Sequence, residues 1–252
     1  MDGRVAIVTG AGSGIGEATA RLLAGEGLDV ALVGRRPGRL DTVRTAIADA
    51  GGEALAVPVD LSRPEAPREI VDAVLHRWQR VDVVVNNAAS FRVTPIEDVT
   101  VEEFDDHVAV NVRAAYFLTQ AALPALRSSP APVVVNVSSA AAALYRRGQS
   151  VYGLTKAAIE HLTLNLAMEL APDGIRVVCV RPGPVETEIH TAAVADPEAR
   201  LRELARLVPL GRVGQPEEIA RWIGHLVAPD ATWMTGSVVT VDGGRTLGPA
   251  GS

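Results

Sequence analysis

Aromatic residues and cysteine are scarce in this sequence. Phe, Trp and Tyr together make up 4% of the 252 residues, whereas 48% are apolar, so the core has to be built from Val, Ile, Leu and Ala. Such residues are typical of parallel strands that helices cover on both faces. The single cysteine, Cys179, excludes an internal disulfide, and its apolar neighbours predict a buried, inert thiol.

Basic runs, metal-binding spacings and membrane-spanning stretches are also missing. The net charge is −6 and no basic run exceeds the pairs Arg35-Arg36 and Arg146-Arg147, which gives no electrostatic basis for a nucleic-acid partner. The five histidines show no ligand spacing with one another or with Cys179, so no metal site is predicted. No apolar stretch is as long as a membrane span, and the N-terminus shows no signal-peptide pattern. We expect a soluble protein of the reducing cytoplasm.

Lysine occurs once among the 24 Lys and Arg residues, and this Lys156 lies four positions after Tyr152 in the run VYGLTK. Residues four apart share one helical face, and the apolar flanks predict a helix. A cation roughly 4 Å from a phenol is worth about 4 kcal/mol at an effective dielectric of about 20. That is enough to lower the phenol pKa from about 10 toward neutrality. Taken alone, the pair is equally compatible with a non-catalytic interpretation, in which the lone lysine is a chance of composition and Tyr152 is a half-buried helix aromatic.

Short apolar runs alternate with amphipathic, helix-like stretches along the whole chain. Such alternation demands right-handed crossovers and a parallel sheet. We therefore expect a single domain, residues 1–252, with an α/β fold. Its core should be a Rossmann-type, doubly wound parallel sheet of seven strands, with helices on both faces. The predicted strands are 5–9, 29–33, 53–59, 81–85, 132–137, 175–180 and 237–241.

One long stretch, about 185–210, has no strand signal. It follows the predicted strand at 175–180 and precedes a helix that begins at Gln215-Pro216. Because it begins at the carboxyl end of a strand, we expect it to form a substrate lid.

A glycine-rich turn, TGAGSGIG at 9–16, connects the first predicted strand to a helix beginning near Ile15. Glycines let backbone N–H groups approach a pyrophosphate at the positive end of a helix. The spacing departs from the usual dinucleotide pattern, but the position between strand and helix indicates a dinucleotide site. Its predicted contact residues are Gly10, Ser13, Gly14, Ile15 and Gly16.

The end of the second predicted strand reads Gly34-Arg35-Arg36, where an acidic residue would bind the ribose hydroxyls of NAD. Guanidinium groups suit bidentate phosphate binding, so Arg35 and Arg36 favour NADP(H) over NAD(H) as the cofactor. The alternative is that both arginines are solvated loop residues.

These features together resemble the short-chain dehydrogenase/reductase family over essentially the whole chain. The resemblance rests on TGAGSGIG, NNA at 86–88, Ser139 placed thirteen residues before Tyr152, YGLTK, and RPGPVET at 181–187. VD at 59–60, VNV around Asn111, and a C-terminal segment with PLGRVGQPEEIA and TGSVVTVDGG add to it.

The resemblance implies a reaction and a set of catalytic residues. Tyr152 would be the acid-base catalyst, and Lys156 would lower its pKa while binding the nicotinamide ribose. Ser139 would hydrogen-bond the reacting carbonyl, and Asn111 would steady a water chain for proton relay. The family's cofactor contacts map onto Asp60, Leu61, Asn87, Ala88, Tyr152, Lys156, Pro182, Gly183, Val185 and Thr187.

Other interpretations of single residues stay open. Ser138 directly precedes Ser139 and is excluded only by the family's spacing. Asn111 could be a satisfied polar residue within a helix, and Asp60 could cap the next helix near 62–64. Tyr116 and Tyr145 are excluded as the catalytic tyrosine, because neither has a lysine four positions on. Ala89 stands where the family usually has glycine, which would cost about 1 kcal/mol if a positive φ is needed there.

The expected activity is reversible hydride transfer between NADPH and a small-molecule carbonyl compound, with reduction as the cellular direction. The pocket should be lined by Ser90, Phe91, residues 140–145, Gln149, Pro184 and His190. Arg146 and Arg147 could attract an acidic substrate, or could lie in a solvated turn. The alternatives are NAD-dependent oxidation of a secondary alcohol, and a cofactor-binding regulator that has lost catalysis.

GQSVY and the C-terminal pattern look most like the 3-oxoacyl-carrier-protein reductases. Those members tend to place basic residues before the fifth and sixth strands, where this chain has SSPAP and APDG, so docking of a carrier protein is not predicted. The family also implies a homotetramer, in which helices corresponding to 101–127 and 151–171 pair between subunits.

Overall fold

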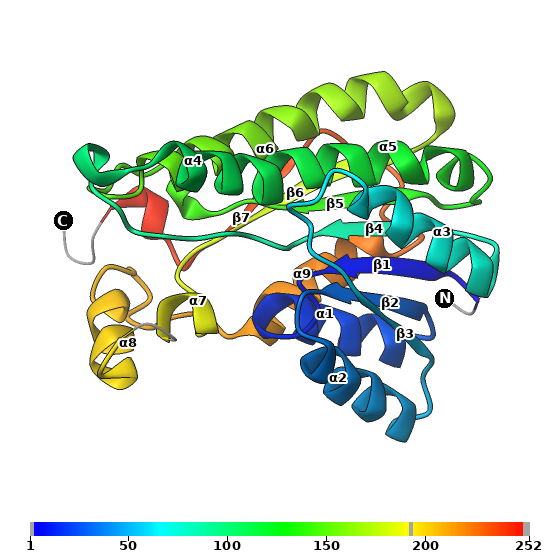
Figure 1. The fold of residues 1–252 in the computed structure, drawn as a ribbon, viewed down its shortest axis with the longest axis horizontal. Coiled ribbons are helices and arrows are strands. Elements are labelled where there is room, and N and C mark those ends of the chain that lie inside the picture. Colours follow the sequence, from blue (N-terminus) through cyan, green and yellow to red (C-terminus); the bar gives the residue numbers. More distant parts are fainter. Residues whose placement is uncertain (1–2, 192–193, 249–252) are drawn as a thin grey trace.

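Seven parallel strands form the centre of the protein, in the order β3-β2-β1-β4-β5-β6-β7 (Figure 1). The computed structural model describes residues 3–191 and 194–248. Valine dominates the central strands, because a β-branched side chain packs well on both faces of a buried parallel sheet. All seven predicted strands are confirmed; β1 has the predicted bounds, and no end of the others is shifted by more than two residues. Their bounds are β1 Val5–Thr9, β2 Asp29–Gly34, β3 Ala54–Pro58, β4 Val83–Asn86, β5 Val133–Val137, β6 Arg176–Pro182 and β7 Val238–Val241.

Helices cover both faces of the sheet, as Figure 1 shows. One face packs against α1 (Gly14–Gly25), α2 (Pro37–Asp49) and α9 (Pro216–Val227), with Leu23, Leu40 and Ile223 in the core between them. The other face packs against the helices α3 (Ala66–Trp78), α5 (Ala114–Leu126) and α6 (Ser150–Leu170). The predicted doubly wound Rossmann-type fold is confirmed.

The expected helical stretch 101–127 is interrupted. It consists of α4 (Val101–Val108), a π-helical turn η2 (Ala109–Arg113) and α5. A π turn inserts one extra residue into a helix and is frequent at functional sites. The turn contains Asn111, one of the predicted site residues. The short 3₁₀ turns are η1 Ile96–Asp98, η3 Ala140–Ala142, η4 Ala171–Asp173 and η5 Arg245–Leu247.

The segment 185–210 has two short helices together with bends and turns. It contains α7 (Glu188–Thr191) and α8 (Pro197–Ala205), while residues 192–193 of the expected lid lie outside the described residues. Val185 forms an isolated bridge with Gly214, which ties the start of the segment to the turn before α9.

Two further sequence-based expectations concern single features. Cys179 is fully buried in β6, as predicted, and burial raises the pKa of its thiol to about 12. Within residues 3–191 and 194–248, no helix is both long and apolar enough to cross a membrane.

Candidate active site

Two adjoining hollows lie beyond the carboxyl ends of the strands. The larger is a cleft of about 650 Å³ beside the glycine-rich loop, and the smaller is a pocket of about 110 Å³ beside Tyr152. Asn87, Ala89 and Phe91 line both, so the cleft opens into the pocket. β1 lies between β2 and β4, and the crevice above this change in strand order is where open α/β sheets bind ligands.

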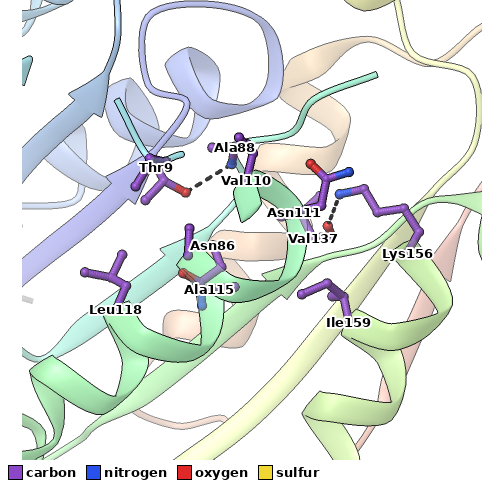
Figure 2. Close-up of a pocket in the computed structure, with 12 residues that line it drawn as sticks. Thr9, Asn86, Ala88, Val110, Asn111, Ala115, Leu118, Val137, Lys156 and Ile159 are labelled. Atoms are coloured by element: carbon purple, nitrogen blue, oxygen red, sulfur yellow. Dashed lines mark hydrogen bonds between the residues drawn. The ribbon is translucent and has the colours of Figure 1, made fainter. Parts of the chain in front are cut away.

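The glycine-rich loop is anchored to the end of β4. The Thr9 hydroxyl accepts hydrogen bonds from the backbone N–H groups of Asn87 (2.9 Å) and Ala88 (3.0 Å), the second of which Figure 2 shows. Gly10 has a φ of +69°, a conformation that glycine adopts without steric cost. At Gly16 a Cβ would lie 2.2 Å from the Gly10 carbonyl oxygen, so only glycine lets α1 start this close to the loop.

Most predicted cofactor residues are brought together in these two hollows. Gly16 is the exception, because it is buried beneath the loop and lines neither. The larger cleft is lined by Gly10, Ser13, Gly14, Ile15, Arg35, Arg36, Asp60, Leu61, Asn87, Ala88 and Thr187. The smaller pocket is lined by Tyr152, Lys156, Pro182, Gly183 and Val185, together with Ile15, Asn87 and Thr187.

Arg36 does not point freely into solvent. Its guanidinium donates to the Ser13 hydroxyl (3.1 Å) and to the carboxylate of Glu188 in α7 (2.8 Å). Arg39 donates to the other oxygen of Glu188 at 2.9 Å. The hydrogen bond from Arg36 is the main cause that lowers the pKa of Glu188. The sequence did not reveal Glu188, because this pairing arises only when the chain folds.

Asp60 forms the local turn that the sequence left open. Its carboxylate accepts a hydrogen bond of 2.9 Å from the Ser62 backbone N–H, and this bond is the largest effect on the Asp60 pKa, which is lowered. The next helix starts only at Ala66, so Asp60 does not cap it.

Tyr152 and Lys156 lie side by side on α6, as their spacing predicts. The lysine ammonium is 5.7 Å from the centre of the Tyr152 ring and donates a hydrogen bond of 2.8 Å to the Val137 carbonyl at the end of β5. Both residues are more than nine-tenths buried. Tyr116 and Tyr145, by contrast, are exposed and lie outside both hollows.

The predicted lowering of the Tyr152 pKa is wrong for this structure. Burial raises the pKa of the phenol to about 12, and a hydrogen bond with Ser139 offsets only part of that effect. Burial also lowers the pKa of Lys156 to about 8. The prediction of a lowered Tyr152 pKa rested on the charge of Lys156. Both groups lose their hydration on burial, and this loss has the larger effect on their pKa values here.

The structure distinguishes the two neighbouring serines. Ser138 is buried, and its single hydroxyl proton has two acceptors within reach, the Glu160 carboxylate (2.8 Å) and the Lys156 carbonyl (3.1 Å). Ser139 lines the pocket and contacts Tyr152. Ser138 thus has a structural environment, and Ser139 is the serine placed to meet a ligand.

Asn111 lies against Lys156, as Figure 2 shows. Its amide donates to the Ser90 carbonyl (3.0 Å) and the Thr155 hydroxyl (2.9 Å) and accepts from the Ser90 N–H (2.7 Å). Asn111 and Lys156 both line a cavity of about 10 Å³, which Asn86, Leu118 and Ile159 also line. This is roughly the space that one water needs. Thr155, which the sequence analysis did not single out, fixes the Asn111 amide.

The smaller pocket contains part of the set of residues predicted to bind the substrate. Phe91, Ala140, Ala141, Leu144, Gln149, Pro184 and His190 line it as expected. Ser90 instead lines the larger cleft, Tyr145 is 99% exposed, and Ala142 and Ala143 do not line the pocket, so these four assignments are wrong. Arg245 and Leu204 also line the pocket, and no sequence signal indicated them.

Ala89 does not carry the predicted strain. Among the residues placed by the structure, Gln79 is the one non-glycine residue with a positive φ, so Ala89 has an ordinary backbone conformation. Its methyl group lies where the cleft meets the pocket.

Comparison with known proteins gives a consistent result. A family model described as "Enoyl-(Acyl carrier protein) reductase" matches residues 10–246. An uncharacterised oxidoreductase of Methylorubrum extorquens is 39% identical over 246 residues, covering 97% of this chain and 98% of the relative.

Solved structures resemble this chain in both fold and sequence. A short-chain dehydrogenase/reductase from Serratia marcescens superposes with a TM-score of 0.91 at 33% identity, covering 97% of this chain and 98% of that chain. A 3-ketoacyl-(acyl-carrier-protein) reductase from Brucella melitensis, complexed with NADH, gives a TM-score of 0.88 at 35% identity, covering 97% and 99%. The chain is an oxidoreductase that belongs to the short-chain dehydrogenase/reductase family.

Proposed function

We propose that the protein is an NADP(H)-dependent reductase that converts a carbonyl group into a secondary alcohol, with Tyr152 as its acid-base residue. The observation that carries the proposal is the meeting of Tyr152, Ser139 and Lys156 in one pocket, directly beside the larger cleft. A phenol, a hydroxyl and an amine at the end of a dinucleotide cleft are the groups that carbonyl reduction needs.

The residues of the larger cleft fit a dinucleotide cofactor. At Gly14 the φ is +56° and a Cβ would lie 2.9 Å from the Thr187 side chain. Only glycine fits this position, and its backbone can therefore come close to a bound cofactor. Bound NADPH supplies a hydride from its nicotinamide ring. The loop and the start of α1 would hold the pyrophosphate, Arg35 and Arg36 the 2′-phosphate, and the residues around Gly183 the nicotinamide.

Tyr152 would donate the proton. With a pKa raised to about 12, its phenol is neutral at pH 7 and carries the proton that a reacting carbonyl oxygen requires. Ser139 would donate a hydrogen bond to the same oxygen as negative charge develops on it. The neutral phenol therefore favours reduction over alcohol oxidation near pH 7.

Lys156 and Asn111 would return a proton to Tyr152. Lys156 remains mostly protonated at pH 7, because its pKa is lowered only to about 8. Both residues line the cavity of about 10 Å³, which has room for about one water, and this water would carry the proton.

Replacing Tyr152 and Arg36 tests the proposal. We expect Tyr152→Phe to lose about 100-fold or more in kcat across a panel of ketones while still binding NADPH. Arg36→Ala should raise KM for NADPH roughly 10- to 100-fold and leave KM for NADH within about two-fold. Arg44→Ala in α2, whose partner is Asp41, is the matched control.

One observation favours NAD as the alternative cofactor. Arg36 is already engaged by Glu188, and this pair would have to open for a 2′-phosphate to bind. Equal KM values for NADPH and NADH in wild type and Arg36→Ala would support an NAD-dependent alcohol dehydrogenase.

Equal, negligible turnover of all ketones by wild type and Tyr152→Phe would support a regulator without catalysis.

The exposed faces of α4, α5 and α6 support a homotetramer. Val101, Phe117, Leu164 and Met168 are apolar and exposed on these helices. Apolar surface of this kind is typical of subunit contacts. A mass measurement in solution tests the assembly. Residues of the segment 185–210, among them His190 and Leu204, line the smaller pocket, which supports its role as a substrate lid.

A further inference from the structure

The substrate pocket contains two cations that have no anionic partner among the residues that the structure describes. Arg146 and Arg245 both line it and are half-buried. In the part of the chain that the structure describes, every other buried or half-buried arginine has a carboxylate or carbonyl partner. These are Arg4, Arg80, Arg113, Arg176, Arg181 and Arg200. The remaining arginines that lack a partner are exposed.

The electrostatic setting of Arg146 is unfavourable for a cation. Burial lowers its pKa, and the charges of Arg245 and Arg200 lower it further. Glu203 is the acidic group that acts on it, but that carboxylate is already bound to Arg200 at 2.7 Å. A half-buried cation surrounded by like charge is costly unless an anion completes the site.

A third group in the pocket also lacks a partner. The Nδ1 atom of His190 in α7 is buried and has no hydrogen-bond partner within residues 3–191 and 194–248. Its ring contacts Phe91, whose ring in turn contacts Tyr152, with centroid separations of 6.1 and 4.8 Å. Burial, with Arg200 and Arg146, lowers the His190 pKa to about 4, so the ring is neutral at pH 7. It can hydrogen-bond a ligand without adding charge.

The neighbouring arginine provides a contrast. Arg147 is exposed and pairs with Glu97 at 3.2 Å, outside the pocket. Thus the pair Arg146-Arg147, which the sequence left undivided, separates into one pocket residue and one surface residue. The pocket, of about 110 Å³, is also much smaller than the 650 Å³ cleft.

We propose that the substrate is a small oxo acid, whose carboxylate binds Arg146 and Arg245 while its carbonyl group meets Tyr152 and Ser139. A guanidinium binds a carboxylate through two parallel hydrogen bonds, and two such groups can bind its two oxygens from different sides. The inference rests on the proposed reductase function and adds the substrate class.

The test compares straight-chain oxo acids, with the carbonyl at successive positions, and their methyl esters at saturating NADPH. We expect wild type to prefer one acid over its ester. Arg146→Gln and Arg245→Gln should each raise KM for that acid roughly 10- to 100-fold, leave kcat nearly unchanged, and alter ester reduction by less than about two-fold. Arg147→Gln is the matched control and should behave as wild type.

Several outcomes overturn the proposal. It fails if wild type reduces every ester as well as its acid, or if Arg147→Gln impairs acid reduction as strongly as Arg146→Gln. It also fails if an oxo phosphonate is reduced in preference to all oxo acids, because the two arginines would then bind a phosphate-like group and not a carboxylate. Thermal unfolding of each variant separates a loss of binding from a loss of folding.

A binding measurement separates failure of this inference from failure of the proposed function. Calorimetric titration of the protein with the corresponding hydroxy acids, in the presence of NADP⁺, requires no turnover. If no carbonyl compound is reduced but hydroxy acids bind in an Arg146-dependent manner, the reductase function fails and the anion site stands. If ketones are reduced but no hydroxy acid binds, the anion site fails and the reductase function stands.

Discussion

Arg36 donates a hydrogen bond of 2.8 Å to Glu188, although 152 positions separate the two residues in sequence. The bond joins the start of α2 to α7, and both of its residues line the larger cleft. Arg39 binds the second oxygen of the same carboxylate. In the proposed function, the 2′-phosphate of NADPH and the Glu188 carboxylate compete for the same guanidinium.

Glu188→Gln should therefore improve the use of NADPH. We expect KM for NADPH to fall about two- to five-fold, because the pair is partly exposed and such pairs contribute little, while KM for NADH stays constant. Initial-rate measurements with both cofactors check this. Glu186→Gln is the control, since Glu186 bonds Gln215 and lies outside the cleft. A rise in KM for NADPH would show that Glu188 helps to hold the cofactor instead.

The fold could be predicted because its signal is local. The runs rich in valine and the glycine-rich turn act over a few residues, and the alternation of strand and helix leaves few topologies. Tyr152 and Lys156 could be paired for the same reason, since helical spacing alone brings them together.

The missed features depend on residues that are distant in sequence. Glu188 meets Arg36, and Arg245 reaches the pocket of Tyr152, only after the sheet has formed. The Tyr152 pKa was predicted in the wrong direction because burial is a property of the whole fold, whereas the nearby charge of Lys156 could be identified from sequence.

Lys156→Met should change how stability depends on pH. The lysine pKa is about 8 in the folded protein and about 10.4 in an unfolded chain. Between these values the unfolded chain binds more protons, so the penalty for burying the charge is complete below pH 8 and disappears as pH approaches 10.4. We expect the stability of the variant relative to wild type to fall by about 3 kcal/mol from pH 7 to 10.5.

Denaturant unfolding of both proteins across this pH range measures the difference. The Tyr152 phenol also loses its proton only at high pH. It is present in both proteins, so its contribution to the free energy of unfolding cancels in the difference. A difference that does not vary with pH would mean that the Lys156 pKa is not lowered in the folded state.

Two glycines of α1 should respond oppositely to alanine. At Gly25 a Cβ would meet nothing within 4 Å and φ is not positive, so Gly25→Ala should stabilise the protein by about 0.5–1 kcal/mol. At Gly16 the Cβ would collide with the Gly10 carbonyl, so Gly16→Ala should destabilise by about 1–3 kcal/mol and weaken NADPH binding. Urea unfolding and NADPH titration check both, and equal effects at the two positions would contradict the close approach at Gly16.

Thr155→Val should destabilise the fold through Asn111. The Thr155 hydroxyl accepts from the Asn111 amide (2.9 Å) and donates to the Tyr152 carbonyl (2.9 Å), and all of these groups are buried. Valine keeps the shape but leaves an amide N–H without a partner, which costs about 1–3 kcal/mol. Thr42→Val is the matched control, because the Thr42 hydroxyl bonds a carbonyl four residues earlier on exposed α2 and should matter by less than about 0.5 kcal/mol. Similar losses of unfolding free energy in both variants would mean that removing a helical hydroxyl, and not releasing Asn111, explains the effect.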